Sequence, residues 1–194
     1  MDIIIATNND HKLKEYKEIL NPLGINCLSL KDENIDVDPD EDGNSFAENS
    51  LIKAKCIAKY TNKPVLADDS GLIIDAMPNE LGIYSKRFME NSPYAIKNAA
   101  IIERLKGKSK TARFICVITL TNFMNKTVQF EGMCEGYIAD SIKGINGFGY
   151  DPIFCALGNE KSMAELKESE KNEISHRGLA TKKLVKFLKE SLGE

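Results

Sequence analysis

The sequence predicts a mixed α/β fold, and three features of the chain support this prediction. Short apolar runs, such as residues 2–7, have the length and composition of buried strands. Apolar residues spaced three and four positions apart follow these runs and indicate amphipathic helices. Apolar and polar residues alternate within residues 126–140, as in a half-buried strand. Alternating helices and strands, followed by a long hairpin, are typical of a sheet covered by helices.

The first part of the chain is expected to alternate strand and helix. We expect strands at residues 2–7, 25–30, 64–67 and 71–76, helices from about residue 10 and over residues 45–60, and an exposed acidic loop at 31–44. Asn9 or Asp10 can cap the first helix and Ser45 the second, because these side chains accept hydrogen bonds from free N–H groups. Ser70-Gly71 suits a tight turn.

The second part is expected to contain a helix, a hairpin and a C-terminal helix. Ser92-Pro93 is a helix start, with proline in the first turn, and the helix runs to about Leu105. Two long strands follow at residues 111–122 and 126–140. The last helix begins near Ser175 and gathers its apolar residues on one side: Ala180, Leu184, Phe187, Leu188 and Leu192.

Composition excludes several classes of protein. The formal net charge of the 194 residues is −3, so no overall positive field attracts nucleic acid or an acidic membrane. The five cysteines form no Cys-x-x-Cys pair and lie mostly in apolar runs, which predicts buried, reduced thiols. No stretch approaches the about 18 apolar residues of a membrane-spanning helix, and a basic leader is lacking, so we expect a cytoplasmic protein.

Residues 6–16, "ATNNDHKLKEY", are a candidate anion site. A strand ends, small polar residues follow, and a helix begins, so its free N–H groups can bind an anion. Lys12, one turn into the helix, can add a full positive charge. The alternative interpretation is ordinary helix capping.

Two acidic segments are candidate metal or catalytic sites. Asp68 and Asp69 are adjacent, so in an extended chain their side chains point to opposite sides. One can therefore face a metal ion or water while the other braces a lysine or a backbone N–H. The alternative is an Asx-type turn.

In the other acidic segment, Asn49 and Lys53 lie four residues apart on one helical face, after the acidic residues 40–42. The alternative interpretation of this segment is a solvated helix face.

Two later segments are candidate sites for an aromatic ligand. In "NGFGYDPIF", residues 146–154, glycines allow close approach of the backbone, Phe148 or Tyr150 can stack on a base, and Asp151 can accept hydrogen bonds. In "EKNEISHRG", residues 170–178, Arg177 can donate two parallel hydrogen bonds to a planar acceptor. The alternatives are a glycine-rich turn and a structural histidine.

Together these segments predict a ligand that is anionic at one end and aromatic at the other. A nucleoside triphosphate with Mg²⁺ fits, because Mg²⁺ prefers one or two carboxylates together with phosphates and water. The chain has neither a Walker A pattern nor a Gly-x-Gly-x-x-Gly motif, so a P-loop or dinucleotide-binding fold is not indicated.

In their order along the chain, "ATNNDHKLKE", "ADDSGL", "GFGYDPIF" and "SHRG" resemble the blocks of the inosine/xanthosine triphosphate pyrophosphatase family, over essentially the whole chain. The resemblance implies a long, curved mixed sheet flanked by helices, with one domain, residues 1–194, forming two lobes around a central cleft. It also implies a homodimer.

The resemblance further implies roles for individual residues. Asp69 is expected to be proton acceptor and Mg²⁺ ligand, Asp68 to support it, and Glu41, or else Asp40, to be the second metal ligand. The residues expected to bind the triphosphate are Thr7, Asn8, Asn9 and Lys12, and Ser70 is also expected to contact the substrate. Those expected to lie toward the base are Phe148, Gly149, Tyr150, Asp151, Lys171, His176 and Arg177. Asn49 and Lys53 are added as substrate-binding residues because of their shared helical face. Asn8 stands where the family has glycine, and asparagine tolerates left-handed backbone better than most residues.

The implied activity is Mg²⁺-dependent hydrolysis of ITP, dITP and XTP to the nucleoside monophosphate and pyrophosphate, which removes non-canonical purine nucleotides from the pool. His176 and Arg177 can donate to a 6-keto oxygen but would oppose the amino group of adenine. Two alternatives remain open on the sequence. One is a phosphatase that releases orthophosphate, and the other is a nucleotide-binding module without catalysis.

Overall fold

The computed structural model describes residues 1–193 and contains one six-stranded sheet in the order β2-β1-β3-β4-β5-β6. The strands are β1 (Asp2–Ile5), β2 (Asn26–Leu28), β3 (Val65–Ile74), β4 (Thr111–Phe123), β5 (Lys126–Ile138) and β6 (Phe154–Ala156). The helices are α1 (Asp10–Leu20), α2 (Phe46–Ile57), α3 (Tyr94–Arg104), α4 (Glu168–Ile174) and α5 (His176–Leu192). Strand β1 is parallel to β2 and β3, whereas β6 is antiparallel to β5. The predicted mixed α/β fold is therefore confirmed.

The chain divides into two compact units. Unit 1 comprises Met1–Asp69, Cys116–Gly132 and Ala180–Glu194, and unit 2 comprises Ser70–Ile115 and Met133–Leu179. The boundary within β3 falls between Asp69 and Ser70. The arrangement of two lobes around a cleft remains a prediction.

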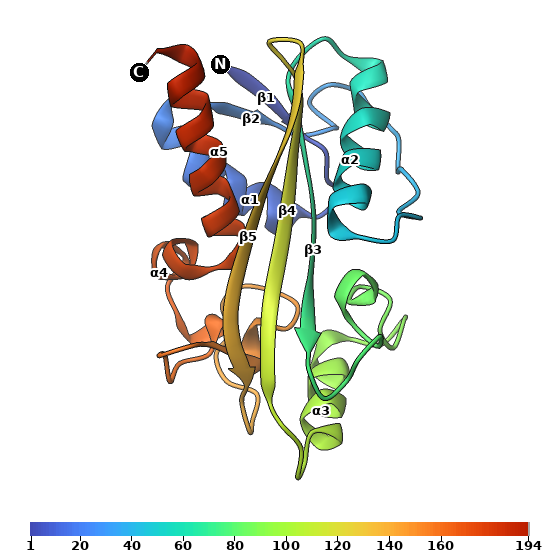
Figure 1. Cartoon of the computed structure of the whole chain (residues 1–194), viewed down its shortest axis with the longest axis vertical. Helices are drawn as coiled ribbons and strands as arrows, with labels where there is room; N and C mark the ends of the chain where they lie inside the picture. Colours follow the sequence, from blue (N-terminus) through green and yellow to red (C-terminus); the bar gives the residue numbers. More distant parts are fainter. Residues whose placement is uncertain (194) are drawn as a thin grey trace. The chain divides into compact units, whose positions relative to one another are not determined.

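In unit 1, the alternation of side chains along β1 and β3 separates two hydrophobic clusters. Ile3, Ile5 and Leu66 pack with residues of α1 and α5, whereas Ile4, Val65 and Ala67 pack with residues of α2. Figure 1 shows α1 and α5 on one side of β1 and α2 on the other. Each strand residue thus faces either the α1 side or the α2 side according to its position in the alternation. By the same alternation, Asp68 lies on the face of β3 that carries Leu66, and Asp69 lies on the face that carries Ala67.

The predicted caps of the first two helices are confirmed. Asn9 caps α1, with its side chain accepting hydrogen bonds from the backbone N–H groups of His11 and Lys12. Ser45 caps α2 and accepts from the N–H of Glu48. Helix α3 differs slightly from the prediction, because Pro93 occupies the N-cap position, with ψ at 149°, rather than the first helical turn.

The predicted turn at Ser70-Gly71 is wrong, and so is the Asx-turn alternative for Asp68-Asp69. Strand β3 runs without interruption from Val65 to Ile74 through all four residues. The glycine meets a steric requirement instead, because a Cβ atom at Gly71 would lie 2.1 Å from the carbonyl oxygen of Gly82. The backbone of the turn at residues 82–85 therefore packs directly on the strand.

The remaining predictions of local structure are largely confirmed. The two long strands form β4 and β5, and the tail helix buries Ala180, Leu184 and Leu188, although Leu192 at its end is 47% exposed. All five cysteines are free thiols, and four are buried. Among residues 1–193, no helix is both long and apolar enough to span a membrane.

Gly71→Ala tests the close packing on β3. We expect a loss of about 3 kcal/mol or more in the free energy of unfolding, because the added methyl group meets backbone that cannot rotate away. The measurement is urea denaturation followed by circular dichroism. Gly24→Ala is the control: its φ is +75° with nothing within 4 Å of the added Cβ, so only about 1 kcal/mol of backbone strain is expected. Equal losses in the two variants would contradict the packing argument.

Candidate active site

The predicted site residues fall into two sets, one in each unit. Unit 1 contains Thr7, Asn8, Asn9, Lys12, Glu41, Asn49, Lys53, Asp68 and Asp69, and unit 2 contains Ser70, Phe148, Gly149, Tyr150, Asp151, Lys171, His176 and Arg177.

Asp68 forms a buried ion pair in unit 1. Its Oδ2 lies 3.0 Å from Nζ of Lys12, and its side chain is only 1% exposed. The thiol of Cys116 also donates to this oxygen, at 3.7 Å. The contact confirms that one carboxylate of the adjacent pair braces a lysine.

Asp69 faces the α2 side and meets different partners. Its Oδ2 accepts a hydrogen bond of 3.1 Å from Nδ2 of Asn49, and its Oδ1 lies 3.8 Å from Nζ of Lys53. The same lysine donates to Oε1 of Glu41 at 2.9 Å. Asn49 and Lys53 thus share the face of α2 that the spacing predicted, and one ammonium group bridges the carboxylates of Glu41 and Asp69.

The loop before α2 is held in place by the same asparagine. Oδ1 of Asn49 accepts a hydrogen bond of 2.8 Å from the N–H of Gly43, two residues after Glu41. Asn49 therefore contacts the acidic loop through its oxygen and Asp69 through its nitrogen. This double contact brings the partly buried Glu41 to Lys53, whereas Asp40 is exposed.

The electrostatics of this cluster favour a cation. Burial raises the pKa of Asp69, and the charge of Glu41 adds to the increase, while Lys53 and Asn49 oppose it. For Lys53, burial alone would lower the pKa, but the charges of Asp68, Asp69 and Glu41 raise it. Within residues 1–193, no group of three His, Cys, Asp or Glu side chains could hold a metal ion. Glu41 and Asp69, both close to Lys53, are the carboxylates of this cluster that could hold a divalent cation together with phosphate and water.

The first block shows helix capping. Asn9 accepts from two N–H groups of α1, and its own N–H donates to Oγ1 of Thr7 at 3.1 Å. Asn8 donates to Oδ1 of Asp38 at 3.1 Å, and its φ does not lie in the left-handed region, so asparagine in place of glycine introduces no strain here. The capping interpretation is confirmed, and anion binding by this block stays a prediction.

In unit 2, Asp151 organises the segment of residues 147–151, which we call the Phe148 loop. Its Oδ2 accepts hydrogen bonds from the N–H of Phe148, at 2.9 Å, and from Nζ of Lys171, at 2.7 Å. Lys171 lies 5.1 Å from the centre of the Phe148 ring. The carboxylate of Asp151 therefore orients both the aromatic ring and the lysine.

His176 and Arg177 begin α5 and lie beside the same ring. Arg177, 2% exposed, donates from Nη2 to Oγ of Ser70 at 2.9 Å, and its guanidinium carbon lies 5.8 Å from the Phe148 ring centre. The imidazole of His176 stacks on Phe114, with 4.5 Å between ring centres. The structure thus gathers Ser70, Phe148 and Arg177, and packing fixes the plane of the histidine.

Tyr150 differs from Phe148 in its environment. It is 4% exposed, belongs to the hydrophobic cluster of unit 2, and donates its hydroxyl hydrogen to the carbonyl oxygen of Ser85 at 2.6 Å. Phe148 is only half-buried, so of the two rings that the sequence allowed, it is the better placed to stack on a base. The sequence did not indicate Ser85 or Asn98, because their contacts join residues more than fifty positions apart in the chain.

Comparisons with known proteins show the family of this chain. The sequence profile of the Ham1 family matches residues 3–187. The chain belongs to the Ham1 family. It is 46% identical over 189 residues to the dITP/XTP pyrophosphatase of Halalkalibacterium halodurans, covering 95% of this chain and 97% of that protein. Identity to the dITP/XTP pyrophosphatase of Bacillus subtilis is 44% over 191 residues, covering 96% of each chain.

A solved structure supports the same assignment. The HAM1 protein from Coxiella burnetii is similar with a TM-score of 0.87 and 39% identity, covering 98% of this chain and 99% of that one. The resemblance to inosine/xanthosine triphosphate pyrophosphatases is therefore confirmed at the level of the Ham1 family.

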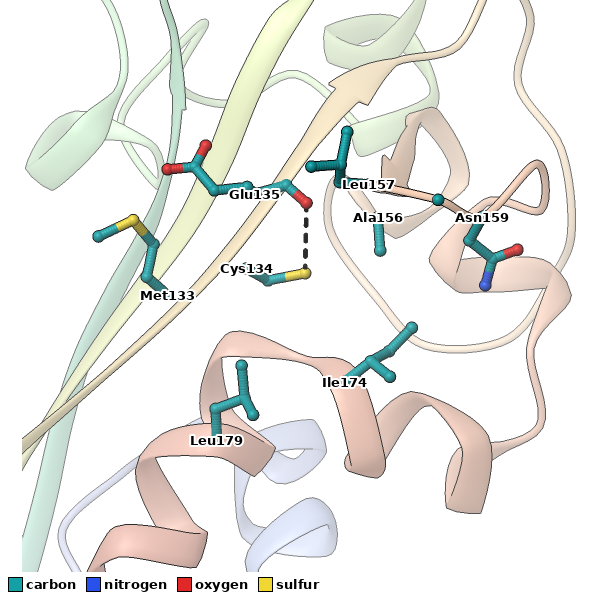
Figure 2. A pocket seen from close by; sticks show the side chains of 9 residues that line it. Met133, Cys134, Glu135, Ala156, Leu157, Asn159, Ile174 and Leu179 are labelled. Atoms are coloured by element: carbon teal, nitrogen blue, oxygen red, sulfur yellow. Dashed lines mark hydrogen bonds between the residues drawn. The ribbon is translucent and has the colours of Figure 1, made fainter.

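Unit 2 also contains a pocket that includes none of the predicted site residues. Its volume is about 400 Å³, and Figure 2 shows its lining of Met133, Cys134, Glu135, Ala156, Leu157, Gly158, Asn159, Ile174 and Leu179. Burial, together with the charge of Glu135, raises the pKa of the Cys134 thiol to about 11. A thiol with this pKa is protonated at neutral pH, so Cys134 does not provide a nucleophile.

Asp68→Ala tests the buried ion pair of this Ham1-family chain. We expect a loss of about 3 kcal/mol in the free energy of unfolding, because Lys12 would keep its charge in a largely buried position without its carboxylate. Urea denaturation measures the change. The control is Glu190→Ala in the exposed pair Lys186–Glu190, 3.9 Å apart, where a loss below about 0.5 kcal/mol is expected. Similar losses of unfolding free energy in the two variants would show that burial of the Asp68 pair contributes nothing to stability.

Proposed function

We propose that this Ham1-family protein hydrolyses the non-canonical purine nucleoside triphosphates ITP, dITP and XTP to the nucleoside monophosphate and pyrophosphate, with Mg²⁺ as cofactor. Its relatives from Halalkalibacterium halodurans and Bacillus subtilis are dITP/XTP pyrophosphatases, which supports the substrate class. The observation that carries the proposal is the cluster in which Lys53 bridges Glu41 and the buried Asp69. It combines a carboxylate of raised pKa with positive charge, as phosphoryl transfer from a polyanion requires.

In the proposed reaction, the oxygen of a water molecule attacks the α-phosphorus while Asp69 accepts a proton from that water. The bond between the α-phosphorus and the α–β bridging oxygen breaks, and pyrophosphate leaves. Asp69 accepts a hydrogen bond from Asn49 and lies 3.8 Å from Lys53, so its carboxylate is held in place for this role. Mg²⁺, when bound by Glu41 and Asp69, offsets negative charge on the phosphates. Lys12 and Lys53 supply further positive charge to the triphosphate.

The residues of unit 2 would recognise the base. Phe148 is half-buried, with Lys171 and Arg177 both near its ring. His176 and Arg177 can donate hydrogen bonds to a 6-keto oxygen, whereas the amino group of adenine would leave these donors unpaired. A buried donor without an acceptor is costly, which provides the basis for rejecting ATP. A homodimer, expected from the resemblance, and a cytoplasmic location, expected from the sequence itself, remain part of this proposal.

Product analysis with several nucleotides tests the activity. We expect purified protein to release pyrophosphate from ITP, dITP and XTP in the presence of Mg²⁺, with much less from ATP, and none after chelation of the metal; GTP is assayed beside them. Pyrophosphate and orthophosphate are assayed in parallel.

Asp69→Asn is the control for this assay, because it keeps the shape of the side chain but removes the proton acceptor. We expect a fall in turnover of about 10³-fold or more with the fold intact. Orthophosphate as the only product would favour the phosphatase alternative. Tight binding of ITP without turnover would favour the binding module, and both results would overturn the proposal.

Glu41→Gln tests the identity of the second metal ligand. We expect the Mg²⁺ concentration for half-maximal activity to rise about tenfold or more, because the amide is a weak ligand and the negative charge is lost. Asp40→Asn, at the exposed neighbour, is the matched control and should leave this concentration within about twofold. Calorimetric titration of Mg²⁺ provides a second measurement. A larger effect at Asp40 would reverse the assignment.

A further inference from the structure

Besides the bond from Lys171 to Asp151, two hydrogen bonds attach the Phe148 loop to residues outside it. Nδ2 of Asn98, in α3, donates to the carbonyl oxygen of Gly149 at 3.1 Å. The hydroxyl of Tyr150 donates to the carbonyl oxygen of Ser85 at 2.6 Å. Asn98 is 2% exposed and Tyr150 is 4% exposed; the bond of Tyr150 is buried and that of Asn98 is partly buried. All four residues belong to unit 2, and the bonds are internal to it.

Ser85 is itself attached to strand β3 close to Ser70. Its Oγ accepts a hydrogen bond from the N–H of Leu72, at 3.0 Å, and donates to the carbonyl oxygen of Gly82 at 2.6 Å. The same turn packs on Gly71 without an intervening side chain. Residues 82–85 therefore connect two parts of unit 2. They contact β3 directly, and they contact the Phe148 loop through Tyr150.

The loop needs such support because of its own sequence. Gly147 and Gly149 flank Phe148 with φ values of 70° and 68°, in the left-handed region that glycine enters freely. Glycine also loses more conformational freedom than other residues when it is ordered. Unless the protein holds this conformation in advance, ordering of the loop lowers the affinity for any ligand that contacts it.

We infer that Tyr150 and Asn98 are positioning residues for base recognition: they hold the Phe148 ring in its place beside Lys171 and Arg177 before the nucleotide binds. The hydroxyl of Tyr150 donates its only hydrogen to the carbonyl oxygen of Ser85, and one N–H of Asn98 donates to that of Gly149, so both side chains act on backbone carbonyls. This inference rests on the proposed function, because it assigns the loop to the purine end of the substrate.

Tyr150→Phe is the primary test, since it removes one hydroxyl and keeps the ring. We expect KM for dITP to rise about tenfold, with kcat within about twofold, as the loss of one buried hydrogen bond predicts. The affinity for IMP, measured by calorimetry, should fall by a similar factor. Tyr137→Phe is the matched control, because the Tyr137 hydroxyl also donates to a backbone carbonyl, that of Asn159 at 3.0 Å, and should leave both values unchanged.

Asn98→Ala provides an independent second test from the other bond. It should also raise KM and weaken IMP binding. Because it removes the other bond, it tests the inference even if Tyr150→Phe fails to fold. Melting temperatures without nucleotide identify a general loss of stability, which would lower the active fraction rather than raise KM.

If both variants match Tyr137→Phe in KM and IMP affinity, the positioning role is wrong while the proposed function stands. If the wild type releases no pyrophosphate but binds IMP, the proposed function fails and the calorimetric comparison still decides the positioning role. Absence of IMP binding by the wild type would overturn it.

Discussion

The alternation of side chains along strand β3 is the constraint on which the rest of the candidate site depends. Asp68 and Asp69 are adjacent, so a continuous strand must send them to opposite faces of the sheet. On one face Asp68 meets Lys12 from α1, and on the other Asp69 meets Asn49 and Lys53 from α2. A turn at this place would have removed the alternation and allowed both carboxylates to meet the same partners. The different environments of the two acids therefore follow from backbone geometry.

Burial of these charges explains why each has a close partner. An ionised side chain removed from water is costly unless a nearby charge and hydrogen bonds compensate for the lost solvation. Lys53 and Asn49 compensate only partly for Asp69, whose pKa stays raised because burial and Glu41 both disfavour its charge. Arg177, Lys171 and Asp151 meet the same requirement in unit 2, where the lysine and the aspartate pair at 2.7 Å. Such pairs restrict the side chains to one geometry, which favours recognition of one ligand shape.

Much of this arrangement could be predicted from the sequence because it depends on local rules. Caps at Asn9 and Ser45 follow from side-chain chemistry, and the shared face of Asn49 and Lys53 follows from helical spacing. The turn at Ser70-Gly71 was predicted wrongly, since a glycine can serve either a turn or a close approach of distant backbone. Only the position of Gly82, eleven residues later, distinguishes the two. The contacts of Asn98 and Ser85 were unpredictable for the same reason, because they join residues more than fifty positions from their partners.

The charges of the unit 1 cluster also bear on the order in which its ligands bind. Three carboxylates, Glu41, Asp68 and Asp69, face two ammonium groups, Lys12 and Lys53, which leaves one negative charge among these side chains. A triphosphate approaching this cluster alone would meet net repulsion, whereas a divalent cation reverses the sign of the total. The ammonium of Lys53, now bridging Glu41 and Asp69, has the charge and hydrogen bonds to contact phosphate once a metal ion satisfies those carboxylates. For the proposed reaction, this charge balance predicts that the cation binds with or before the nucleotide, and that Lys53 contacts the carboxylates before that event and phosphate after it.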